Sequence, residues 1–217
     1  MTGVPGRAEH PVDELDHIRR EIVEHPSNAW ATELGWEPLF AGSARARVLV
    51  IGQAPGRVAQ ETGQPWSDVS GRLLRSWLGV TEATFYDPDQ FALLPMDFYF
   101  PGKGASGDLP PRPDVAPLWH PRILSALTEV RLTVLVGAYS QRYYLHGQKR
   151  QSVTETVRAA ETFLPFFPLV HPSPLARGWR SRNPWFEETT VPRLAQEVRR
   201  ALDGGSSGRL AADGFEG

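Results

Sequence analysis

Four short runs of mostly apolar residues recur along the chain, each bounded by glycine, proline or charged residues. They are residues 47–51, 91–96, 132–136 and 167–170. A short apolar run between turn-forming residues is typical of a strand that is buried on both faces. The pattern therefore predicts four buried strands.

Between these runs and on either side of them, apolar positions recur every three to four residues, which is the period of an amphipathic helix. The first such segment, residues 13–25, has Asp13 as a candidate N-cap. The others are residues 70–78, 119–130, 138–146, 153–160 and 183–202, the last interrupted at Pro192. Strands that alternate with helices predict an α/β fold: a three-layer α/β/α sandwich around a central, mainly parallel four-stranded sheet.

The two ends of the chain differ from the middle in composition. Residues 1–12 form a polar stretch, and glycine and serine dominate residues 203–217. Neither stretch has much to bury, so we expect a flexible N-terminal arm and a flexible C-terminal tail. The total of 217 residues leaves room for a single domain between them, residues 13–202.

Two polar loops directly follow predicted strands. GQAPGRVAQETGQPWSD, residues 52–68, follows the first strand, and HPSPLARGW, residues 171–179, follows the last. Ligands of parallel sheets bind where strands end at the carboxyl edge, so both loops are candidates for a site. A third segment, residues 97–117, has no helical or alternating pattern. A loop of that length in a single domain is uncommon unless it is functional or disordered, and its aromatic and proline content argues against disorder.

Composition narrows the possible chemistry. The chain has no cysteine, which excludes disulfides, thiolate zinc sites, iron-sulfur clusters and a cysteine nucleophile. The hydrophobic content of 41% and charged content of 22% are those of a soluble protein, and no secretory signal pattern is present at the N-terminus. We expect a cytoplasmic monomer without a membrane segment. The net charge of −2 does not indicate a polyanionic partner, so a surface that binds nucleic acid would need local clustering of positive charge.

The two strand-end loops together are similar in sequence to the motifs of a known protein family. Taken alone, HPSP favours a rigid turn with a surface histidine over a functional site. However, GQAPG followed by GQPWSDVSGRLL, together with HPSPLARGW, resembles the two motifs of the uracil-DNA glycosylase superfamily. The likeness covers roughly residues 45–195 and is greatest to a bacterial branch that has the segments LLPMDFYFPGKGASGDLPPRPDVAPLWHP and RNPWFEE. The first motif is similar to that of the iron-sulfur glycosylases, but the cluster cysteines are missing, so we expect neither a cofactor nor a metal.

The resemblance implies a monofunctional DNA glycosylase of base excision repair. Such an enzyme flips uracil or another deaminated base out of DNA and uses water to hydrolyse its N-glycosidic bond. By resemblance, His171 would donate a hydrogen bond to the leaving base at O2, and backbone N–H groups after Gly52, including that of Gln53, would be further donors. Trp66 would stack on the base. The alternatives are structural: His171 would be an ordinary hydrogen-bonded histidine at a strand end, and Trp66 would be a residue of the hydrophobic core.

The second motif also implies contacts with DNA. By resemblance, Ser173 and Leu175 belong to the loop that penetrates the helix, and Leu175 would fill the gap left by the flipped nucleotide. Arg177, Arg180 and Arg182 would then meet phosphates, with Lys103 as a further candidate. The alternative for these arginines is an ordinary solvated face.

The sequence departs from the superfamily pattern at two places. Ala54 stands where many efficient members carry a water-activating aspartate, and the Gln53 side chain cannot replace it as a base. Asp68, in the same loop, is the first candidate for the missing acid, and Asp97 is the second. Met96 and Asp97 also stand where an asparagine would read the base, which puts strict uracil preference in doubt. One oxyanion donor contributes about 3 kcal/mol of the about 8 kcal/mol that even a modest enzyme supplies, so we expect a slow or differently selective enzyme.

Two other classes of function remain open. One is a catalytically weak module that binds damaged DNA or a nucleobase, having kept the pocket and lost the acid. The other is an N-glycoside hydrolase of nucleosides or nucleotides with the same pocket but no DNA wedge. Neither motif contains a lysine, which favours a water nucleophile over a Schiff base.

Overall fold

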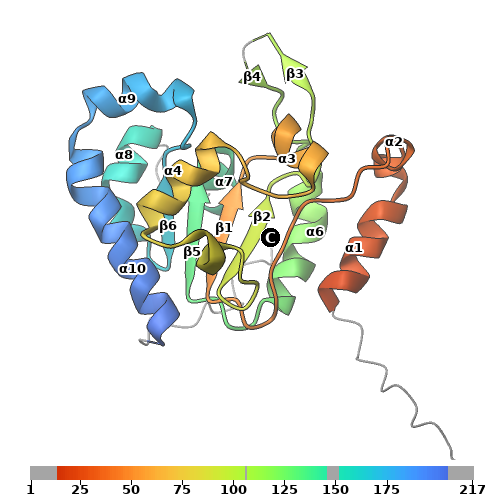
Figure 1. Cartoon of the computed structure of the whole chain (residues 1–217), viewed down its shortest axis with the longest axis horizontal. Helices are drawn as coiled ribbons and strands as arrows, with labels where there is room; N and C mark the ends of the chain where they lie inside the picture. Colours follow the sequence, from red (N-terminus) through yellow and green to blue (C-terminus); the bar gives the residue numbers. More distant parts are fainter. Residues whose placement is uncertain (1–13, 106, 146–151, 205–217) are drawn as a thin grey trace, which may run out of the picture.

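A parallel four-stranded sheet forms the centre of the computed structural model, which describes residues 14–105, 107–145 and 152–204 (Figure 1). The strands are β1 (Val48–Gly52), β2 (Phe91–Pro95), β5 (Leu132–Val136) and β6 (Phe166–Leu169). Their order is β2-β1-β5-β6, and every neighbouring pair is parallel. Each strand lies within one residue of its predicted bounds, so the predicted sheet is confirmed.

Helices cover both faces of this sheet. The side chains of β1 alternate between them: Leu49 and Ile51 belong to one buried cluster, whereas Val48 and Val50 belong to the other. The first cluster includes residues of α1 (Glu14–Glu24), α6 (Val115–Ala126) and α7 (Ala138–Tyr144). The second includes residues of α4 (Val69–Leu78), α8 (Val153–Arg158) and α10 (Val191–Asp203). Figure 1 shows α1 and α6 on one side of the sheet and α4, α8 and α10 on the other, which is the predicted three-layer sandwich.

Short elements connect these layers. Near the N-terminus lie the 3₁₀ turn η1 (Pro26–Asn28) and α2 (Ala29–Glu33), and α5 (Glu82–Phe85) precedes β2. Near the C-terminus lie the 3₁₀ turns η2 (Ala160–Phe163) and η3 (Pro174–Ala176), the helix α9 (Arg177–Arg182) and the π-turn η4 (Phe186–Thr190). Two further elements interrupt predicted loops: α3 (Arg57–Thr62) and an antiparallel hairpin of β3 (Lys103–Gly104) and β4 (Gly107–Asp108).

Two helix predictions and one loop prediction need correction. The helix expected at residues 119–130 is α6, which begins earlier, at Val115, and ends earlier, at Ala126. Pro117 is tolerated in its first turn, where a missing N–H costs no hydrogen bond. The segment expected at residues 183–202 is divided just before Pro192, because the π-turn η4 ends at Thr190 and α10 begins at Val191 with Pro192 in its first turn. The segment 52–68 is not one continuous loop, because α3 forms within it.

The predicted ends fall mostly outside the described residues. The arm 1–12, the candidate cap Asp13 and residue 146 are not among them, and neither is the tail from residue 205 onward. Asp203 is the last residue of α10, and Gly204 caps that helix in the left-handed conformation. No helix in the described part of the chain is both long and apolar enough to cross a membrane.

A buried histidine ties the end of β2 to α7. His120 is fully buried, with Nε2 lying 3.1 Å from the Pro95 carbonyl oxygen and Nδ1 2.6 Å from the Tyr144 hydroxyl. A carbonyl oxygen only accepts hydrogen bonds, so Nε2 carries the proton and Nδ1 accepts from Tyr144. Burial lowers the pKa of His120 to about 4, against an ordinary value of 6.5. The ring is therefore neutral across the physiological range.

This neutral histidine makes stability depend on pH. Between pH 6.5 and about 4 the unfolded chain binds a proton that the folded chain excludes, so the folded state loses stability as the pH falls. The expected loss in this window is about 3 kcal/mol. Chemical denaturation of wild type and His120→Gln across this range measures it, because the variant lacks the titrating group. Across this range we expect the free energy of unfolding of wild type to fall by about 3 kcal/mol more than that of His120→Gln. Equal falls in the two proteins would contradict the prediction.

Candidate functional site

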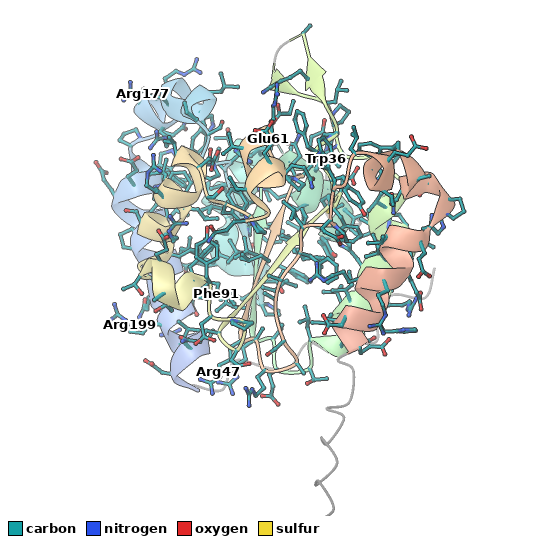
Figure 2. The ribbon with its side chains drawn as sticks, turned by 45° about the vertical axis from the view of Figure 1, so that its right-hand side comes forward. Trp36, Arg47, Glu61, Phe91, Arg177 and Arg199 are labelled. Carbon is teal, nitrogen blue, oxygen red and sulfur yellow. The ribbon has the colours of Figure 1, made fainter. Side chains whose placement is uncertain are left out.

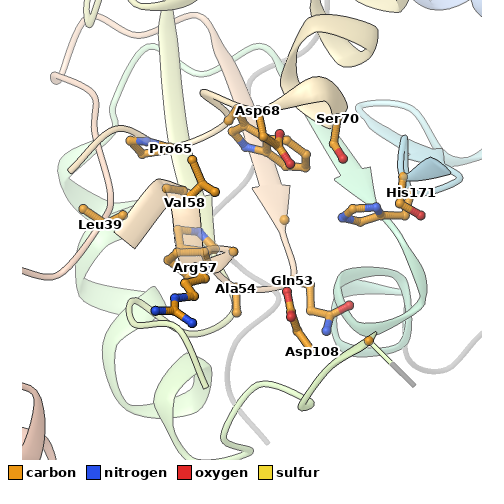
Figure 3. A pocket seen from close by; sticks show the side chains of 18 of the residues that line it. Leu39, Gln53, Ala54, Arg57, Val58, Pro65, Asp68, Ser70, Asp108 and His171 are labelled. Carbon is orange, nitrogen blue, oxygen red and sulfur yellow. The ribbon is translucent and has the colours of Figure 1, made fainter. Parts of the chain in front are cut away.

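A pocket of about 700 Å³ opens at the carboxyl edge of the sheet. The turn after β1, the start of α4, the β3–β4 hairpin and the loop after β6 all contribute to its lining (Figure 3). Segments that are far apart in sequence thus meet at one place. Among the residues singled out from the sequence, the lining includes Gly52, Gln53, Trp66, Asp68, His171, Ser173 and Leu175.

The first glycine of the β1 turn allows an aromatic ring to approach the backbone. A Cβ on Gly52 would lie 2.9 Å from Cζ2 of Trp66. The turn is also held from behind, because Met96 donates its N–H to the Gly52 carbonyl at 2.9 Å and Asp97 donates to that of Gln53 at 3.2 Å. The indole therefore packs directly on a fixed strand end.

Trp66 adopts an unusual backbone conformation to reach this position. Its φ is +58°, a left-handed value that costs a non-glycine residue roughly 1–2 kcal/mol. Its carbonyl oxygen accepts a hydrogen bond from Nη1 of Arg75 at 3.1 Å and lies against Gly71, where a Cβ would be only 1.7 Å away. Tyr86 donates to the Pro65 carbonyl at 2.9 Å. These contacts offset the backbone cost and aim the indole into the pocket.

His171 lies beside this indole. The two ring centroids are 5.8 Å apart and the planes differ by 33°. Behind the histidine is Gly137, whose added Cβ would lie 3.6 Å from the His171 Cβ. Burial lowers the pKa of His171, while the negative charges of Asp68 and Asp108 oppose that shift. A neutral imidazole here can donate a hydrogen bond without bringing a positive charge into the pocket.

Asp68 lines the pocket and also caps α4. Its Oδ1 accepts the backbone N–H of Gly71 at 3.0 Å. An N-cap of this kind typically contributes about 1 kcal/mol to stability. One of its two carboxylate oxygens is therefore engaged in holding the helix.

The structure does not bring Met96 and Asp97 to the pocket. Met96 is buried in the apolar cluster on the α1 and α6 side of the sheet. Asp97 is only 1% exposed, and Arg112 holds both of its oxygens at 2.8 Å through Nε and Nη2. Asp97 also accepts the backbone N–H of Tyr99 at 3.3 Å and that of Arg112 at 3.1 Å. A carboxylate so fully occupied is a structural clamp for the segment that follows β2.

The loop after β6 presents an apolar tip and an uneven set of arginines. Leu175 is 84% exposed, more than any other large hydrophobic side chain among the described residues. Arg177 and Arg182 are exposed on α9, and Figure 2 shows Arg177 at the same end of the molecule as Glu61 of α3. Arg180 differs, because its side chain is only 18% exposed. Its guanidinium lies over the Trp77 ring at 5.7 Å and donates to Glu187 at 3.0 Å.

The pocket also contains residues that sequence reasoning missed. Arg57 and Ser70 line it, and so does Asp108 of the hairpin. The unusual length of segment 97–117 did mark it as a candidate functional loop, but no motif identified Asp108. No group of three or more histidine, cysteine, aspartate or glutamate side chains suited to a metal occurs within the described residues.

An aromatic ring, a neutral imidazole and two carboxylates around a pocket at the edge of a parallel sheet define a class of site suited to a flat, polar ligand such as a nucleobase. The family model of the uracil DNA glycosylase superfamily matches residues 40–195. This range covers most of the chain and both strand-end loops, and the chain belongs to this superfamily. It does so with no cysteine for an iron-sulfur cluster. Membership supports a hydrolase of the DNA glycosylase type that acts in DNA repair.

The close contact between Gly71 and the Trp66 carbonyl gives a test of how the indole is held. Gly71→Ala should destabilise the protein by about 1–3 kcal/mol, because the added methyl group has no room, although alanine favours a helix. Gly178→Ala is the matched control, since Gly178 is also helical and a Cβ there meets nothing within 4 Å. We expect the control to be neutral or stabilising by up to about 1 kcal/mol in chemical denaturation. Equal effects of the two changes would contradict the proposed packing.

Proposed function

We propose that this protein is a monofunctional DNA glycosylase that hydrolyses the N-glycosidic bond of uracil or another deaminated base in DNA. The base would be flipped into the pocket, and water would be the nucleophile. The single observation that carries the proposal is the meeting of Trp66, His171 and the exposed Leu175 around one pocket. Each of the three meets a different need of base excision.

The first need is stabilisation of the departing base. Breaking the glycosidic bond places negative charge on the base, and a well-placed donor to an oxyanion contributes about 2.7–4 kcal/mol. His171 supports this role because burial keeps its ring neutral and it lies beside the indole against which the base would stack. Stacking on Trp66 would add about 1–3 kcal/mol of binding that is largely independent of base identity.

The second need is access to a base inside DNA. An apolar side chain inserted into the duplex offsets part of the cost of unstacking a nucleotide. Leu175 is exposed at the rim of the pocket and supports this role. Arg177 and Arg182 are exposed nearby and available to phosphates, whereas Arg180 is engaged with Glu187 and Trp77.

The presence of alanine rather than an acid at position 54 favours a second candidate function, that of a weakly catalytic module that binds a damaged base. Ala54 lines the pocket and offers no acid to activate water. Such a module would bind DNA containing a deaminated base tightly without releasing the base.

Base release separates these candidates. We expect wild type to release the base from oligonucleotides that contain uracil, hypoxanthine or xanthine and to leave an abasic site without cutting the strand. His171→Ala should reduce the single-turnover rate by about 10²–10³-fold, because it removes the proposed donor. His17→Ala, an exposed histidine of α1, is the control and should leave the rate unchanged. Full activity in His171→Ala would refute the assignment, and no release by excess wild type would refute the function.

The proposed insertion of Leu175 into the duplex as a wedge is tested by comparing the rates of base release from duplex and from single-stranded DNA. Leu175→Ala should slow release from duplex DNA by about tenfold or more while leaving single-stranded DNA little affected, because only the duplex must be opened. Leu34→Ala removes another exposed leucine, 59% exposed at the end of α2, and should change neither rate. Equal losses on both forms of DNA would argue against a wedge.

A further inference from the structure

The β3–β4 hairpin carries a carboxylate into the pocket. Lys103 and Asp108 are direct cross-strand partners, and Nζ of Lys103 lies 2.6 Å from Oδ1 of Asp108. Both residues line the pocket. A salt bridge of this kind leaves Oδ2 of Asp108 outside the pair and restricts the rotamers of the carboxylate.

Both legs of the hairpin are anchored to the body of the protein. On the outgoing leg, the backbone N–H of Phe100 donates to Oε1 of the buried Gln60 in α3 at 3.0 Å. On the returning leg, Arg112 is bound to the buried Asp97 by two hydrogen bonds of 2.8 Å. Between these points, Leu109 donates its N–H to the Gly102 carbonyl at 2.9 Å. The two legs that carry Asp108 are therefore anchored by buried contacts, although Asp108 itself lies on the projecting hairpin.

The hairpin places this carboxylate against the turn that follows β1. Oδ2 of Asp108 lies 3.9 Å from the position that a Cβ on Gly56 would occupy. Nε2 of Gln53 is 3.5 Å from the Leu109 carbonyl oxygen, so the turn and the hairpin are in contact. Figure 3 shows Asp108 beside Gln53, on the opposite side of the pocket from Asp68. Burial lowers the pKa of His171, and the negative charges of Asp68 and, to a smaller extent, Asp108 oppose that shift, so both carboxylates interact electrostatically with the imidazole.

The turn that Asp108 approaches is the one that carries Ala54. We propose that Asp108 is the carboxylate that activates water in this pocket, supplied from the hairpin to a turn that has no acid of its own. This assignment rests on the proposed function. Lys103, Asp97 and Arg112 are then positioning residues, because they act by fixing Asp108.

The proposed step is a balanced hydrolysis. The bond between the sugar C1′ and the base nitrogen breaks, and its electron pair leaves with the base. The water oxygen bonds to C1′, and Oδ2 of Asp108 takes one proton from that water. Asp108 then returns the proton to solvent, and the base anion takes one from solvent. One water is consumed, and the products are the free base and an abasic sugar.

Asp68 is the competing carboxylate, and its place in the fold makes it less suited to this role. Each of the two carboxylates has one oxygen committed, Oδ1 of Asp68 to the Gly71 N–H at the start of α4 and Oδ1 of Asp108 to Lys103, so position separates them. Asp68 belongs to the turn that holds Trp66, on the side where the base would stack. Asp108 lies across the pocket on the projecting hairpin. The sugar of a flipped nucleotide would remain on that outer side, connected to the DNA strand.

The test compares carboxylate variants under single-turnover conditions, with the deaminated base that wild type releases fastest. Asp108→Asn should reduce the rate by about 10²-fold or more, as expected for loss of a general base. Asp68→Asn should reduce it by less than about tenfold, because asparagine keeps the helix cap. Glu61→Gln removes a nearby surface charge that does not line the pocket and should leave the rate within about twofold.

Two readouts separate activation of water from a structural role. Affinity for an oligonucleotide with a cleavage-resistant 2′-fluoro sugar should change by less than about threefold in Asp108→Asn. Added formate should increase the single-turnover rate of Asp108→Ala by at least about tenfold, because formate can replace the missing proton acceptor.

Four outcomes overturn the assignment. The first is a rate for Asp108→Asn within about threefold of wild type. The second is a parallel loss of rate and affinity without rescue by formate. The third is a larger loss of rate in Asp68→Asn than in Asp108→Asn. The fourth is no base release by wild type, which overturns the proposed function as well, whereas the first three leave it intact.

Discussion

Parallel pairing of β1 with both β2 and β5 is the constraint on which the rest of the structure depends. Because all four strands run in the same direction, their carboxyl ends meet at one edge, and the segments that leave them converge there. The turn after β1 and the loop after β6 line the pocket from these ends, while the backbone N–H groups of Met96 and Asp97, which follow β2, hold the β1 turn in place. The sheet itself supplies no reactive side chain, but it determines which segments become neighbours.

Hydrogen bonds and close packing around the pocket then hold individual side chains in place. Trp66 keeps a left-handed backbone because Arg75 binds its carbonyl oxygen and Gly71 leaves space for it. Asp68 connects the same turn to the start of α4. On the other side of the pocket, the clamp between Asp97 and Arg112 holds one leg of the hairpin. Side chains and hydrogen bonds therefore support the pocket on both sides.

Sequence reasoning succeeded where the signal is local. The four strands are short apolar runs between turn residues, so their bounds were predicted to within one residue. It failed where neighbours in space decide the outcome. The helix α3 forms inside a segment that looked like a loop, and its Gln60 is held by Glu37 and Phe100, which lie far away in sequence. Asp97 looked like a candidate reactive acid after a strand, but Arg112 holds it in the core.

The sequence by itself determined the family, the alternation of strands and helices, and the two loops that line the pocket, because these depend on motifs and on periodic burial along a continuous segment. Only the tertiary structure decided which acids and arginines are available for chemistry. Arg177 and Arg180 occupy the same short helix, yet one is exposed while the other lies over Trp77. Asp97 and Asp108 belong to the same predicted loop, yet only Asp108 lines the pocket. The physical reason is that the availability of a charged side chain is set by partners that fold against it from distant parts of the chain.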